Sequence, residues 1–76
     1  MRRDEWLAGF CERLGLEAPS KEEVVALLDL AATAAHASER TAAPLACWVA
    51  GRSGRSFEEL GETAKEVAPV PADDQD

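Results

Sequence analysis

The segment from Ser20 to Ser38 constrains the fold most, because it contains neither glycine nor proline. Ser20 and Glu23 match the S-x-x-E capping box, in which each side chain accepts a hydrogen bond from the other residue's free backbone N–H at a helix start. Wound as an α-helix, the segment carries apolar residues on almost every side and leaves one narrow polar wedge. The apolar residues that form this surface include Val24, Val25, Leu27, Leu28, Leu30, Ala31, Ala32, Ala34 and Ala35. A helix of this kind belongs in the middle of a bundle, where its alanines let neighbouring helices approach closely.

A first helix is predicted ahead of this segment, from near Asp4 to Gly15. The Asp4 carboxylate can cap free backbone N–H groups at the positive end of the helix, and Gly15 can adopt the left-handed conformation that commonly ends one. Apolar residues recur there at helical spacing, at Trp6, Leu7, Phe10, Cys11 and Leu14. The pattern predicts a helix with one buried face, and we expect Trp6 to lie in the core.

A third helix is predicted after Thr41, which is placed to cap it. Its body runs from Ala42 to Ala50, and Pro44 is tolerated because the first turn leaves the backbone N–H unpaired anyway. Gly51 is predicted to end the helix, and residues 52–55 then form a mobile, glycine-containing loop.

A fourth helix is predicted after Ser56, which forms a second S-x-x-E box with Glu59. Pro69 is expected to stop it. Its inward-facing residues are expected to be Phe57, Leu60, Ala64 and Val67.

These four helices predict an all-α fold, a compact bundle of four short helices with a disordered acidic C-terminal tail. A chain of 76 residues supports one core only, so we assign residues 1–68 to a single helical domain. Residues 69–76 combine two prolines with three aspartates, a composition typical of disorder. Because a chain this short buries only about 60% of the surface that its unfolded form exposes, a partner that covers more of it is plausible from size alone.

Composition excludes several classes of protein. No apolar run approaches the roughly 20 residues that a bilayer requires, so we expect no membrane span. Met1-Arg2-Arg3 is followed by acidic residues instead of a hydrophobic segment, so we expect no secretory signal and a cytoplasmic location. Cys11 and Cys47 are too few for a disulfide framework, and we interpret both as reduced core residues.

The net charge of −7 argues against nucleic-acid binding, because phosphate repulsion would have to be overcome by a concentrated basic patch. The acidic residues are unevenly distributed. The stretch from Arg40 to Phe57 contains three arginines, Arg40, Arg52 and Arg55, and no acidic residue. We call this stretch the arginine island.

Four polar residues form one stripe on the wedge of the central helix if that helix reaches Arg40: Asp29, Thr33, His36 and Arg40. One interpretation is that the stripe is simply the solvated side of the helix. The other is that these residues join Arg52 and Arg55 in a binding patch for an anionic small molecule (phosphate, nucleotide or pterin) or a partner. Residues 51–56 lack the spacing of a phosphate-binding P-loop, and no strand is predicted before them, so we expect a plain connector there.

The body of the third helix has no polar side chain, although a surface helix should have a polar face. Either this helix is central too, or it leaves an apolar strip exposed. Four short helices can hardly surround two of their members, so we favour an exposed interface with a partner or a second copy, formed by Pro44, Leu45, Trp48 and Val49. Trp48 is a candidate anchor, because tryptophan is enriched at interface hot spots; the alternative is that it is an ordinary core residue.

Catalysis and metal binding have little support. One histidine, no tyrosine and no paired carboxylates in an apolar setting leave few acid–base candidates, so we predict no enzyme activity. A dyad of His36 with Cys47 or Cys11 is conceivable, but both cysteines lie on apolar faces where nothing obvious lowers a thiol pKa. No zinc-ligand spacing occurs, and we predict no metal and no cofactor.

Three stretches resemble a small bacterial helical family of unknown function: Leu28-Asp29-Leu30-Ala31, then Ala35-His36, then Arg40-Thr41-Ala42-Ala43-Pro44-Leu45. Trp6-Leu7 and Leu14-Gly15-Leu16 are similar as well, so the resemblance covers residues 4–68. Members of that family stand alone or are appended to molybdenum-cofactor guanylyltransferase domains. The resemblance therefore implies an accessory role near molybdenum cofactor maturation.

The resemblance places the family's recurrent polar positions at Asp29, His36 and Arg40, and its Ala-Pro-Leu turn at residues 43–45. Thr33 departs from the acidic residue expected one turn before His36, which weakens the idea that a carboxylate orients the His36 ring. The family has no assigned catalytic residues to transfer.

Our first hypothesis is a non-enzymatic interaction module, self-associating or bound to a protein of cofactor synthesis or redox chemistry. The second is a domain that binds a small anionic ligand. Nucleic-acid binding is a distant third.

Overall fold

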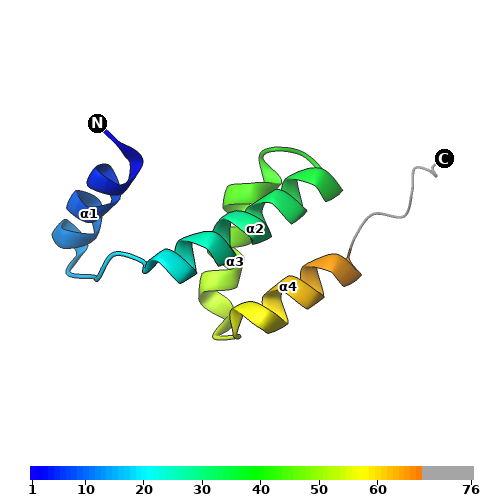
Figure 1. Ribbon diagram of the computed structural model, residues 1–76. Helices are drawn as coiled ribbons and strands as arrows, with labels where there is room; N and C mark the ends of the chain where they lie inside the picture. Colours follow the sequence, from blue (N-terminus) through cyan, green and yellow to red (C-terminus); the bar gives the residue numbers. More distant parts are fainter. Residues whose placement is uncertain (68–76) are drawn as a thin grey trace.

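The computed structural model describes residues 1–67, and these residues form four α-helices (Figure 1). The helices are α1 (Arg3–Leu14), α2 (Lys21–Ala37), α3 (Ala42–Ser53) and α4 (Phe57–Glu66). The described part of the chain contains no strand. The predicted all-α class and its four helices are thus confirmed. The predicted disordered tail, residues 69–76, lies outside the described residues.

Helix α2 is the central element, as predicted, because both α3 and α4 pack against it. The core of the described residues is small: Leu30 of α2 and Ala50 of α3 are each 8% exposed. On the same side of α3, the Cys47 Sγ lies 4.0 Å from the Leu27 carbonyl oxygen of α2. Helix α1 lies beyond the N-terminal end of α2, apart from α3 and α4 (Figure 1). This placement lengthens the molecule, whose Cα radius of gyration is 14.3 Å against about 11 Å for a compact domain of this length.

The start of α1 differs from the prediction that Asp4 caps it. Helix α1 begins at Arg3, and Arg2 holds the extended cap conformation. The Arg2 N–H donates to the Glu5 carboxylate at 3.1 Å, so Glu5 performs the capping. Asp4 lies inside the first turn and accepts a hydrogen bond from the Arg3 guanidinium at 2.8 Å.

The end of α1 is as predicted. Gly15 has a φ of 74°, which is the left-handed region that favours glycine. Its N–H donates to the Glu12 carbonyl, and the Leu16 N–H donates to the Cys11 carbonyl. These bonds satisfy carbonyl groups that a helix end otherwise leaves without partners.

The capping box of α2 is confirmed in both directions. The Glu23 N–H donates to the Ser20 hydroxyl at 3.1 Å, and the Ser20 N–H donates to the Glu23 carboxylate at 2.8 Å. Helix α2 ends at Ala37, one residue before the predicted end. Arg40 therefore lies in the turn that leads to α3, and the polar stripe stops at His36.

Helix α3 is longer than predicted, because it continues through Gly51 and ends at Ser53. Glycine costs a helix interior about 1 kcal/mol but does not end it; the conformation that does so is the positive φ of Gly54, 72°. The Ser53 hydroxyl donates to the Ala50 carbonyl at 2.7 Å and accepts from the Arg55 N–H at 3.0 Å. The predicted loop at residues 52–55 is thus wrong for its first two residues. Thr41 holds the N-cap position as predicted but has helical backbone angles and makes no side-chain cap bond.

Helix α4 keeps half of its predicted capping box. The Glu59 N–H donates to the Ser56 hydroxyl at 3.1 Å, whereas the Glu59 carboxylate pairs with the Arg55 guanidinium at 3.4 Å. Leu60 and Ala64 are half-buried, as expected for inward-facing residues. Val67 was expected to face inward but is 75% exposed, because the helix ends just before it, at Glu66.

Two glycine substitutions test this account of α3. We expect Gly54→Ala to lower the free energy of unfolding by about 1 kcal/mol, because alanine is strained at positive φ. The matched control, Gly51→Ala, adds a Cβ that meets no atom within 4 Å, and we expect it to raise the same free energy by up to about 1 kcal/mol. Urea unfolding followed by circular dichroism measures both. Equal effects of the two substitutions would contradict the assigned helix end.

Candidate protein-interaction surface

Helix α3 exposes four apolar side chains, which we call the α3 strip: Pro44, Leu45, Trp48 and Val49. Leu45 is 65% exposed, Trp48 64% and Val49 58%. The spacing of these residues places them on one side of the helix, while Cys47 and Ala50 on the other side pack toward the core. The apolar strip is therefore exposed as expected, while its role as an interface stays a prediction.

An apolar groove of about 470 Å³ separates α3 from α4 and extends the strip. Its α3 wall includes three alanines, whose short side chains fill little of the space between the helices. Among the residues that line it, Thr63 is the one with a polar side chain. We call this hollow the α3–α4 groove, and its lining residues are Leu30, Ala42, Leu45, Ala46, Val49, Ala50, Leu60, Thr63, Ala64 and Val67.

The indole of Trp48 is held by a cation. The Arg52 guanidinium carbon lies 4.5 Å from the centroid of the Trp48 ring, one helical turn along α3. A guanidinium over an aromatic face is attracted by the ring quadrupole, by about 0.5–1 kcal/mol at an exposed site. This contact limits the conformations of the Trp48 indole. A side chain that is already restricted loses less conformational entropy when it binds a partner.

The six residues predicted as a polar binding patch are only partly brought together. Thr33 and Asp29 are joined on α2, because the Thr33 hydroxyl donates to the Asp29 carbonyl at 3.1 Å. His36 is exposed in the last turn of α2.

The arginines of the predicted patch lie at two different places. Arg40 precedes α3 and Arg52 is near its end, so the rise of the helix separates their backbones by about 15 Å. Arg55 forms an ion pair with Glu59. A ligand-binding role for these residues stays a prediction.

A second cavity, which the sequence reasoning missed, lies where α2 begins and α3 ends. It has a volume of about 650 Å³, and apolar residues including Leu27, Cys47 and Phe57 make up much of its lining. Glu17 and Glu23 line it together with Arg55. Two carboxylates and one guanidinium give this cavity no preference for an anion.

Helix α1 carries its own uncovered apolar stripe, formed by Trp6, Phe10 and Leu14. These side chains are 54%, 50% and 56% exposed, and the rings of Trp6 and Phe10 stack with their centroids 5.0 Å apart. The expectation that Trp6 lies in the core is wrong, because α1 stands apart from α3 and α4 and buries little of its apolar face.

Both cysteines are free thiols and half-buried.

The described residues give no support for a metal site, since residues 1–67 hold no group of three or more potential His, Cys, Asp or Glu ligands. The pKa of Arg3 is raised by its hydrogen bond to Asp4, and this pair lies on α1, away from the predicted patch. No helix in the described part of the chain has the length and apolar character needed to cross a membrane.

The model of a domain of unknown function, DUF6457, matches residues 1–74. No curated protein and no solved structure shows a significant match to this chain.

The exposure of Trp48 can be tested by its small effect on folding. Because its side chain is 64% exposed, we expect Trp48→Ala to lower the free energy of unfolding by less than about 1 kcal/mol. The control is Leu30→Ala in the core, for which we expect a loss of about 3 kcal/mol. Denaturant unfolding in dilute solution measures both. A loss at Trp48 as large as that at Leu30 would contradict the placement of the α3 strip on the surface.

Proposed function

We propose that this chain, which belongs to the DUF6457 family of domains of unknown function, is a non-enzymatic interaction module that buries the α3 strip against another protein surface. The observation that carries the proposal is the exposure of Leu45, Trp48 and Val49 side by side on one helix. Soluble proteins rarely leave such contiguous apolar patches in water unless the patch binds something.

The small interior supports the same proposal. Among the described residues, Leu30 and Ala50 alone are buried, so the hydrophobic contribution to folding is limited. Association that covers the α3 strip removes further apolar surface from water, at about 25 cal/mol per Å². A protein that binds the α3 strip of the folded chain therefore also stabilises the fold.

The arginine island supports a partner with an acidic rim. Arg40 precedes α3 and Arg52 lies in its last turn, so a positive charge stands near each end of the helix. No acidic residue lies between Arg40 and Phe57. Charges at the rim of an interface contribute to orientation and association rate more than to affinity. The partner surface that complements the α3 strip and its arginines is therefore an apolar patch with an acidic border.

The resemblance of this chain to domains appended to molybdenum-cofactor guanylyltransferases suggests where the module acts. We propose an enzyme of that class as its partner and an accessory role in cofactor maturation as its function. Among the stretches that carry the resemblance, the one from Arg40 to Leu45 includes Pro44 and Leu45 of the α3 strip, so the shared residues and the proposed surface overlap.

A binding measurement tests this proposal. With the immobilised chain and a purified molybdenum-cofactor guanylyltransferase, we expect saturable binding that Trp48→Ala weakens by about 30-fold or more, the loss typical of an aromatic hot spot. The matched control is Val25→Ala, because Val25 is 68% exposed on α2 and lies outside the α3 strip. Binding that is unaffected by Trp48→Ala would remove the strip as the surface. Absence of binding by the unaltered chain would remove this class of partner.

A further inference from the structure

We propose that the α3–α4 groove receives helix α1 of a second copy of this chain, so that two copies form a symmetric dimer with two equivalent contacts. The inference rests on the proposed function, because the groove shares Leu45 and Val49 with the α3 strip. Within residues 1–67 the chain carries both halves of such a contact: an apolar groove that no helix of these residues fills, and an amphipathic helix whose apolar stripe none of them covers.

Helix α1 has two apolar sides that are used differently. Leu7 and Cys11 are half-buried, and Leu7 lines a small cavity of about 140 Å³ together with Pro19 and Val24 at the start of α2. This side of α1 faces the start of α2. The neighbouring stripe of Trp6, Phe10 and Leu14 stays exposed, with the i, i+4, i+8 spacing that helices present to grooves.

The stripe and the groove match in length. From Trp6 to Leu14 the helix rises by about 12 Å, and from Ala42 to Ala50 the α3 wall of the groove rises by the same about 12 Å. The alanines of that wall leave room for large side chains, and the stripe supplies two aromatic rings and a leucine. A groove with small residues and a helix with large ones pack by interdigitation.

The occupant is the α1 of another copy and not of the same one. The groove extends along α2 to Leu30, about 15 Å of helix rise beyond Ser20, where the chain arrives from α1. Helix α1 lies beyond the opposite end of α2, apart from the groove (Figure 1). A second copy, related by a two-fold axis, has no such restriction, and its own groove receives the first copy's α1 in return.

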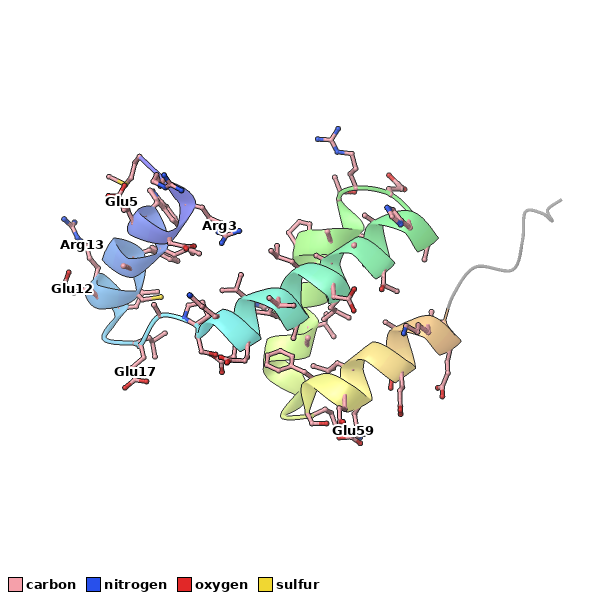
Figure 2. All side chains as sticks on the ribbon, viewed as in Figure 1. Arg3, Glu5, Glu12, Arg13, Glu17 and Glu59 are labelled. Atoms are coloured by element: carbon pink, nitrogen blue, oxygen red, sulfur yellow. The ribbon has the colours of Figure 1, made fainter. Side chains whose placement is uncertain are left out.

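The area that the contacts bury fits a dimer. Two equivalent contacts, each covering two aromatic side chains and several aliphatic ones, bury on the order of 1,500 Å², the size of a standard stable interface. Figure 2 shows Glu5 and Glu12 on the side of α1 turned away from α2, from which they can reach another molecule. Arg13 lies on that side of α1 as well, and the groove is bordered by the arginine island on α3 and by the glutamates of α4, so charges of both signs meet across the contact.

The test is the mass of the full chain in solution, measured by sedimentation equilibrium from micromolar to millimolar concentration. We expect a dimer of the 8.1 kDa chain. Phe10→Glu on α1 and Val49→Glu in the groove should each weaken dimerisation by about 30-fold or more, because each places a charge in both contacts. The matched control, Val25→Glu, lies on the exposed side of α2 and should leave the dimer intact. Circular dichroism verifies that each variant keeps its helices.

Mixing the two weakened variants sharpens the test. The Phe10→Glu copy has an intact groove and the Val49→Glu copy has an intact α1, so a mixture can form one of the two contacts and should associate more strongly than either variant alone. Monomeric behaviour of the unaltered chain up to about 1 mM, where an interface of standard size is saturated, would overturn the inference. So would a dimer that survives Phe10→Glu or is lost in Val25→Glu. A monomer that still binds another protein through Trp48 would contradict the dimer while leaving the proposed function in place.

Discussion

The packing of α2 against α3 and α4 around Leu30 and Ala50 is the contact on which the rest of the structure depends. Alanines on both α2 and α3 let these helices approach closely, but such small side chains remove little apolar surface from water. The larger apolar residues of α1 and α3 lie outside this contact and remain exposed. A core built from small residues thus leads directly to a surface rich in large apolar ones.

That surface is the basis of the functional account. A chain of this size has little interior to begin with, and here its tryptophans are at the surface instead of in the core. Exposed apolar groups lower stability and solubility unless another molecule covers them. The proposed association therefore rests on Trp48, which contacts Arg52 and is bordered by Leu45 and Val49.

Local signals in the sequence predicted the helices well. Ser20 with Glu23, Ser56 and Gly15 mark helix ends through hydrogen bonds within a few residues, and each is found in its predicted place. The end of α3 was missed because Gly51 and Gly54 look alike in sequence, and only the backbone φ distinguishes them. The exposure of Trp6 was missed because helical spacing shows which side of a helix is apolar but not whether another element packs on it. The α3–α4 groove depends on the distance between two helices, which no local pattern contains.

The most direct test of the central claim is the accessibility of Trp48 to acrylamide, a neutral quencher of indole fluorescence that the arginine island does not attract. In a Trp6→Phe chain, Trp48 is the sole tryptophan. Our account predicts that its fluorescence is quenched readily in the isolated dilute chain and becomes protected when a saturating protein partner is added. Strong protection in the isolated chain, or unchanged quenching in the complex, would contradict the claim that the α3 strip is the surface that this domain buries.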